Sequence, residues 1–193
     1  MAFLKPEADG PVVLPPLNYV QSPNQSSRTT AIRTVVLHDT EGSYSGAVNW
    51  LCNPKAQASA HVVLREDGLE ATQLVPYNHK AWACVAYNNQ SLNIEMAGLA
   101  STGYGDSELR HAARIVAFFL HKYNLPAVHV KPDARGVLGK GWSLHQDLGT
   151  LGGGHHDPGF SPSKAWWFGQ LVKAELARSG FRPVWGYDDT PEV

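Results

Sequence analysis

Cysteine is scarce in this chain of 193 residues, which contains only Cys52 and Cys84. The sequence allows one disulfide between them. Two cysteines cannot build the multi-disulfide framework that holds many small secreted domains together. A chain of this length does not need one, because it can bury roughly 70% of the surface that its unfolded form exposes. The length therefore predicts one domain with a hydrophobic core of its own.

Long apolar runs and dense runs of one charge are also absent. No stretch approaches the ~20 apolar residues of a membrane-spanning helix, so stable membrane insertion is not expected. The formal net charge is −1 and no cluster of Lys and Arg occurs, which argues against a nucleic-acid partner held through its phosphates. The first residues, MAFLKPEADGPVVLPP, contain no apolar signal core. We therefore expect synthesis in a cytoplasm, without a signal peptide.

Hydrophobic patterns along the chain predict an α/β domain with a central mixed β-sheet flanked by helices. Strands are expected in a β-branched apolar run, in a hairpin that turns at Glu66-Asp67-Gly68, and in an alternating segment: 31–40, 59–76 and 90–98. Helices are expected where the apolar spacing is helical and capping residues flank it: 44–54, 106–126 and 161–180. The glycine-rich residues 127–162 are expected to be mostly loop.

Histidine is the residue type that stands out, with nine in the chain. The stretch GGGHHDPGF, residues 152–160, places His155, His156 and Asp157 in consecutive positions. A catalytic zinc site needs three protein ligands and one open position, and imidazole and carboxylate groups suit it. His38, at the end of a predicted strand, together with His145 and Asp157 would provide such a set. Polar loop residues around a turn explain the same stretch equally well, since no local zinc motif such as HExxH is present.

Four blocks of the sequence, in order, resemble a known family. They are TVVLHDTEG, ASAHVVLREDG, NNQSLNIEMAG and the pair HQDLG…HHDPG, which together cover about residues 31–160. This chain is similar in these blocks to the zinc-dependent N-acetylmuramoyl-L-alanine amidases of the type-2 amidase family, relatives of the peptidoglycan recognition proteins. The resemblance implies a fold like that of the recognition proteins. It also implies hydrolysis of the amide bond between N-acetylmuramic acid and L-alanine in bacterial peptidoglycan.

Residue by residue, the resemblance implies a zinc ion held by His38, His145 and Asp157. Glu95 matches the glutamate thought to assist the attacking water. His155 stands where many members have a catalytic lysine, two positions before the last ligand. Histidine can replace that lysine as a hydrogen-bond donor to the developing oxyanion, but it is not a fixed cation. This departure leaves open how strongly the transition state is stabilised.

Two further residues match positions beside the substrate groove. The resemblance assigns His61 and Trp82 to substrate binding. Judged from the residues alone, His61 is equally explained as a buried sheet histidine, and Trp82 nearly as well as a core residue. Asp147 is a candidate for orienting a ligand histidine, or for capping a turn.

Composition at the two ends and the resemblance between them predict the domain organisation, and the resemblance predicts the biological setting. We expect an extended N-terminal arm at residues 1–30, the amidase catalytic domain at 31–180, and a C-terminal tail or linker at 181–193. The triple glycine and the absence of a signal peptide are most similar to a phage endolysin. Such a protein is made in the host cytoplasm and acts on the cell wall, as a monomer by default. A further wall-binding domain or release through a holin pore would complete its route.

Two other functions stay open at this stage. One is a non-catalytic recognition module that binds peptidoglycan, since related domains keep the groove and lose a metal ligand. The intact set of three candidate ligands argues against it. The other is a cysteine peptidase that uses Cys52 or Cys84. Cys52 falls late in a predicted helix, whereas catalytic thiols more often lie at a helix N-terminus.

Overall fold

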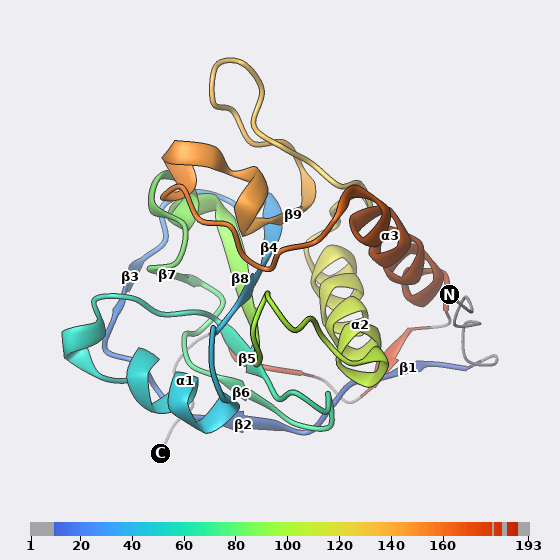
Figure 1. Cartoon of the computed structure of the whole chain (residues 1–193), viewed down its shortest axis with the longest axis horizontal. Helices are drawn as coiled ribbons and strands as arrows, with labels where there is room; N and C mark the ends of the chain where they lie inside the picture. Colours follow the sequence, from blue (N-terminus) through green and yellow to red (C-terminus); the bar gives the residue numbers. More distant parts are fainter. Residues whose placement is uncertain (1–9, 179, 183–184, 189–193) are drawn as a thin grey trace.

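Six strands form the central sheet of the molecule, in the order β2-β6-β5-β8-β4-β9 (Figure 1). The structure is a computed structural model that describes residues 10–178, 180–182 and 185–188. The strands comprise β2 (Leu17–Tyr19), β4 (Thr34–Asp39), β5 (Val62–Leu64), β6 (Ala71–Gln73), β8 (Ser91–Met96) and β9 (Gly141–Leu144). β4 pairs in parallel with both β8 and β9, whereas β5 and β6 are antiparallel. The sheet is therefore mixed, as predicted.

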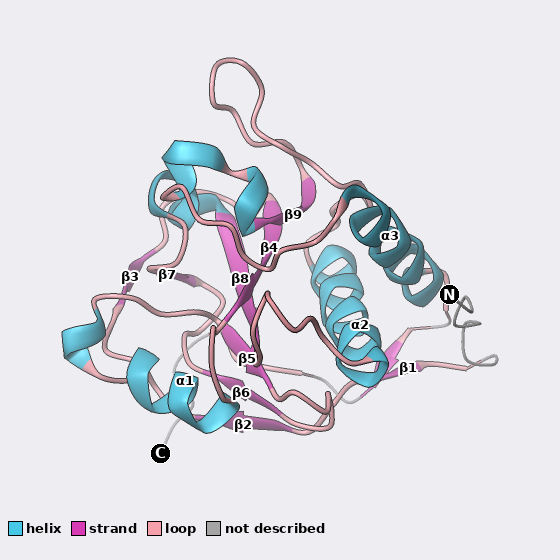
Figure 2. Cartoon of the chain, viewed as in Figure 1, coloured by secondary structure: helices cyan, strands magenta, loops and turns pink. Residues whose placement is uncertain are grey.

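Two long helices, α2 (Asp106–Lys122) and α3 (Pro162–Leu176), pack against each other and cover one face of the sheet (Figures 1 and 2). Acidic residues in the first turn of α2 and basic residues in its last turn complement the helix dipole. Ser161 caps α3 by accepting a hydrogen bond from the backbone N–H of Lys164. The shorter α1 (Tyr44–Leu51) packs against a separate apolar cluster around Val63 and Leu74.

Side-chain alternation along the central strands separates an apolar face from a polar one. Val35 and Leu37 of β4 join the core beneath α2 and α3, as do their partners on β8. Successive residues of a strand point to opposite faces. The residues that alternate with these on β4 and β8 therefore face away from α2 and α3. They include three polar side chains: His38, Asn93 and Glu95. The candidate chemistry lies on this second face.

The sequence predictions of regular structure are largely confirmed. The hairpin forms between β5 and β6, and each of the three predicted helices contains an observed one. Residues 127–162 are mostly loop, as predicted, but they also contain β9 and two short 3-10 helices that were not predicted, η3 (His145–Asp147) and η4 (Gly149–Gly152). β9 has only four residues and begins with glycine, so its strand character comes from pairing with β4.

A short segment covers the outer edge of β9. The backbone N–H of Val130 donates to the carbonyl of Trp142, and the N–H of Trp142 donates to the carbonyl of Val128. The imidazole of His129 stacks on the Trp142 indole, with ring centroids 4.3 Å apart. In the strand that leads to His145, Trp142 is therefore also hydrogen-bonded on the side away from β4.

The described ends of the chain pack onto this domain. β1 (Val12–Val13) pairs with β10 (Phe181–Arg182), and β3 (Gln25–Ser27) pairs with β7 (His79–Ala81). The buried indole of Trp185 donates to the carbonyl of Pro15. The boundaries at residues 30 and 180 stay a prediction, with residues 1–9 and 189–193 outside the described part.

The remaining short helices are η1 (Pro54–Ala56) and η2 (Val85–Gln90). Within the described residues, the helices include none with the length and apolar character to cross a bilayer.

Gly141 begins β9 with a φ of +145°, and a β-carbon there would lie 2.2 Å from the carbonyl oxygen of Val128. We expect Gly141→Ala to lower the free energy of unfolding by roughly 2–4 kcal/mol, because backbone strain and overpacking add. Urea unfolding measures this change. Gly105→Ala is the control, since φ is −69° and no atom lies within 4 Å of the added carbon. It should cost under about 1 kcal/mol, and equal losses would contradict the explanation.

Candidate metal centre

Parallel strand pairing brings the two candidate histidine ligands together. β4 and β9 run in register from Thr34 beside Gly141 to Leu37 beside Leu144. His38 and His145 are the next residues of each chain segment, so they lie side by side at the carboxyl ends of neighbouring strands. In open α/β sheets this edge is where ligands bind. Asp157 reaches the same point from the loop between η4 and α3.

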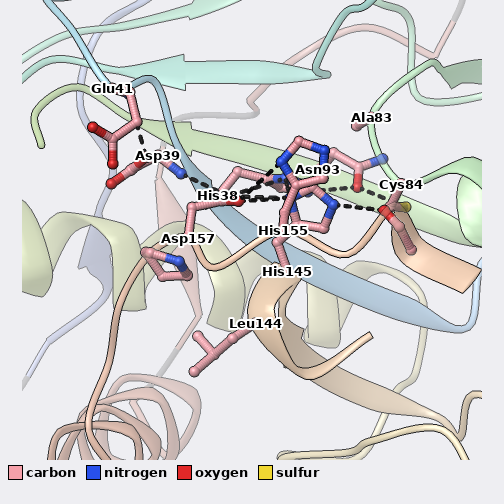
Figure 3. Close-up of polar contacts among 12 residues, drawn as sticks. His38, Asp39, Glu41, Ala83, Cys84, Asn93, Leu144, His145, His155 and Asp157 are labelled. Atoms are coloured by element: carbon pink, nitrogen blue, oxygen red, sulfur yellow. Dashed lines mark hydrogen bonds and ion pairs between the residues drawn. The ribbon is translucent and has the colours of Figure 1, made fainter. Parts of the chain in front are cut away.

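The nitrogen and oxygen atoms of these side chains converge in one small volume (Figure 3). The Nδ1 atoms of His38 and His145 are 2.9 Å apart. The Asp157 carboxylate lies 3.0 Å from Nδ1 of His145 and 3.6 Å from Nδ1 of His38. Candidate ligand atoms from all three residues lie within 4.8 Å of one another, and both histidines are buried. The structure thus assembles the predicted ligand set.

Hydrogen bonds on the far side of each ring assign the tautomers. Nε2 of His145 lies 2.9 Å from the carbonyl oxygen of Gly152, which can only accept a hydrogen bond. Nε2 of His38 donates in the same way to Oδ1 of Asn93 at 3.0 Å. With Nε2 protonated on each ring, the lone pairs of the two Nδ1 atoms point at each other and at the carboxylate. A cation among these acceptors would satisfy all of them.

Zinc fits this donor set. Two imidazole nitrogens and one carboxylate oxygen are the ligands of an open catalytic zinc site, and each histidine donates its other N–H to an oxygen that orients it. Burial, together with the neighbouring His145, lowers the pKa of His38 to about 3 despite the opposing effect of Asp157. The His38 imidazole is therefore neutral at physiological pH, as a metal ligand must be.

Glu95 lies beside His38 on the adjacent strand β8, at the registered position on the same face. Its Oε2 atom is buried and has no hydrogen-bond partner among the described residues. Burial raises the pKa of this carboxyl well above its usual value, and the charges of Asp157 and Asp39 raise it further. An unpaired buried carboxyl oxygen is costly unless a ligand or water meets it, and this one lies next to the metal centre.

His155 lies on the solvent side of the cluster. Its imidazole stacks on His145 with ring centroids 4.4 Å apart, and its Nδ1 is 3.7 Å from Oδ1 of Asp157. The side chain is 59% exposed. A molecule that approaches the cluster from solvent therefore meets His155, whose predicted catalytic role stays a prediction.

The predicted substrate-binding residues differ in their surroundings. His61 is buried, and its Nδ1 accepts a hydrogen bond from the backbone N–H of Asn93. Its Nε2 contacts the His79 carbonyl and the guanidinium of Arg28, both at 3.1 Å. Both ring nitrogens thus have protein partners, and substrate binding by His61 stays a prediction. Trp82 is half-buried, and its indole N–H donates to Oγ of Ser26 at 3.0 Å. Its place in a substrate groove also stays a prediction.

Two groups that orient the ligands were missed by sequence reasoning, namely Asn93 and the Gly152 carbonyl. Asn93 stands two residues before Glu95, so strand alternation places it on the same face and could have found it. The Gly152 carbonyl could not be found in this way, because every residue has a backbone carbonyl and the residue type does not show which one orients a ligand.

The suggestion that Asp147 orients a ligand histidine was wrong, because its carboxylate binds His129 at 2.8 Å and Lys131 at 2.6 Å.

Neither cysteine is placed for nucleophilic catalysis. Both are free thiols, and Cys84 is fully buried. Burial raises the pKa of Cys84 to about 12 and also raises the pKa of Cys52. A reactive cysteine requires the opposite shift, toward the thiolate. The cysteine-peptidase hypothesis therefore has no support in the structure.

The fold and the metal centre together define a candidate metal-dependent hydrolase, and comparison with known proteins specifies the family. The profile of the N-acetylmuramoyl-L-alanine amidase family (Amidase_2) matches residues 28–160. N-acetylmuramoyl-L-alanine amidase A of Achromobacter lyticus is 37% identical over 84 residues, which are 44% of this chain and 48% of that protein. The match thus spans about half of that relative. The chain belongs to the N-acetylmuramoyl-L-alanine amidase family.

Solved structures confirm the fold. AmiA of Staphylococcus aureus, solved in complex with its ligand, superposes with a TM-score of 0.64 at 16% identity, over 88% of this chain and 85% of that one. The endolysin of the Thermus scotoductus MAT2119 bacteriophage Ph2119 gives a TM-score of 0.54 at 17% identity, over 82% and 98% of the two chains. The predicted α/β architecture, similar to that of this family, is therefore confirmed.

Removal of a ligand side chain should sharply reduce zinc binding. We expect the purified protein to hold about one zinc ion per chain and Asp157→Ala to hold far less, because two imidazoles alone do not complete the site. Elemental analysis after dialysis measures the content. His156→Ala is the matched control, since this exposed neighbour in the same loop is not among the cluster residues. Equal zinc in both variants would exclude Asp157 as a ligand.

Proposed function

We propose that this protein hydrolyses the amide bond between the lactyl group of N-acetylmuramic acid and L-alanine of the stem peptide in bacterial peptidoglycan, with zinc as cofactor. The observation that carries the proposal is the convergence of His38, His145 and Asp157 beside Glu95. This arrangement occurs in a chain of the N-acetylmuramoyl-L-alanine amidase family. The three ligands leave the solvent side of the cluster to water and substrate.

The amide bond is a poor electrophile and water a poor nucleophile, so both need activation. Zinc held by the three ligands would polarise the carbonyl and acidify a water molecule. Glu95 would accept a proton from the attacking water and pass it to the nitrogen of L-alanine as the C–N bond breaks. His155, exposed above the cluster, would donate a hydrogen bond to the carbonyl oxygen as negative charge develops on it.

We further propose that this amidase is a phage endolysin. The likeness of its fold to that of the Ph2119 endolysin supports this role. The triple glycine at residues 152–154, which by sequence resembles phage lysins, supports it as well. On this proposal the protein is made in the host cytoplasm, and a separate membrane pore gives it access to the wall. Its partner is peptidoglycan, and it acts as a monomer. Expression inside a bacterium with and without a co-expressed pore protein tests the role, because lysis should require the pore.

Digestion of purified peptidoglycan tests the reaction. Cleavage at the proposed bond releases L-alanine amino ends without new reducing sugars, which separates an amidase from a glycosidase. We expect a chelator to abolish the release, added zinc to restore it, and thiol alkylation to leave it unchanged. Binding of peptidoglycan without hydrolysis, in protein that contains zinc, would instead favour the recognition module.

Glu95→Gln should separate proton transfer from metal binding. The amide keeps the shape of the side chain but cannot accept the proton, so we expect kcat to fall about 10²–10⁴-fold. Zinc content should stay at the wild-type value, because Glu95 is outside the ligand set. Release of L-alanine ends and elemental analysis measure the two quantities. Full turnover in the zinc-loaded variant would rule out the proton-transfer role.

A further inference from the structure

One tyrosine hydroxyl joins two of the chain segments that carry candidate metal ligands, those of His38 and Asp157. Tyr104 lies in the segment between β8 and α2, and its hydroxyl is 2.5 Å from Oδ2 of Asp39 and 2.9 Å from the carbonyl oxygen of Pro158. Asp39 directly follows His38, and Pro158 directly follows Asp157. Both partners are acceptors, so the one O–H proton is shared between them in a three-centre hydrogen bond, which bridges the immediate neighbours of two candidate ligands.

A second contact continues this bridge to a ligand itself. The backbone N–H of Asp39 donates to Oδ2 of Asp157 at 3.3 Å, across 118 positions of sequence. The Asp39 side chain is buried, and its other oxygen accepts a hydrogen bond from the N–H of Glu41. Asp39 is thus held at both carboxylate oxygens while its N–H points at the Asp157 carboxylate.

The ring of Tyr104 is anchored independently of its hydroxyl. It meets the Phe160 ring edge-on with centroids 5.9 Å apart, and the Lys164 ammonium lies 4.9 Å from its centroid. Phe160 lies just before α3, and Lys164 lies in the first turn of α3. Removal of the hydroxyl alone should therefore leave the ring in place, and the effect of the bridge can be measured separately.

We propose that Tyr104 is a positioning residue of the metal centre. Its hydroxyl locks Asp39 and Pro158 together, which sets the distance between His38 and Asp157 before zinc binds. The geometry that carries this inference is the single hydroxyl shared between neighbours of two ligands. The proposal rests on the zinc site of the proposed function and is independent of the substrate.

Tyr104→Phe tests the proposal through zinc affinity, measured by competition with a chromophoric chelator. Partners outside the ligand set typically contribute 10–100-fold to metal affinity, and we expect the zinc Kd to rise by that factor. Tyr123→Phe is the matched control. It also removes one hydroxyl, here 3.0 Å from the Asp188 carboxylate, and the ring remains. Its zinc Kd should equal that of the wild type. The melting temperature of the metal-free protein should change by a similar amount in Tyr123→Phe and in Tyr104→Phe.

Asp39→Asn, alone and combined with Tyr104→Phe, closes a double-mutant cycle. If the hydroxyl acts through Asp39, its loss should weaken zinc binding less in the Asp39→Asn background than in the wild type, because interacting residues are non-additive. A Tyr104→Phe variant with wild-type zinc affinity would overturn the proposal, and so would equal weakening by Tyr123→Phe. If the wild-type protein binds no zinc, the proposed function fails as well, so the two failures are distinguishable.

Discussion

The parallel pairing of β4 with β8 and β9 is the constraint on which the rest of the site depends. One register places His38 between two neighbours, with Glu95 on one side and the residue after Leu144 on the other. A slip of one residue would turn every side chain of β4 to the opposite face. It would put His38 into the apolar core and Leu37 among the metal ligands. The core beneath α2 and α3 therefore enforces the geometry of the metal centre.

A chain of buried polar groups extends from the centre into the sheet. His38 donates to Asn93, the N–H of Asn93 donates to His61, and His61 contacts Arg28. Buried polar groups are tolerated when each has partners, and a satisfied network holds its members in one arrangement. Arg28 reaches this network from the segment before β4. Burial lowers the pKa of its guanidinium to about 10. The N-terminal segment thus contributes to the support of His38 although it supplies no candidate ligand.

Regular structure with strong local signals was predictable from sequence, and structure made by distant pairing was not. The hairpin has its Gly68 turn and α2 has its apolar spacing and terminal charges. β9, with the sequence Gly-Trp-Ser-Leu, becomes a strand only beside β4. The metal ligands followed from resemblance to a family, since spacing alone does not bring His38 near Asp157. The support of those ligands was largely hidden, because Gly152 acts through its carbonyl and Tyr104 through a hydroxyl whose partners are remote in sequence.

The covered edge of β9 has a consequence for how the protein behaves among other chains. A strand at the margin of a sheet normally offers free N–H and C=O groups to any extended peptide, and this promotes aggregation. Here residues 128–130 occupy that margin beside Trp142. A foreign strand cannot add at this place without first displacing the segment and the stacked His129 ring. The element that delivers His145 is thereby insulated from intermolecular β-pairing, so the metal centre and resistance to aggregation share one local structure.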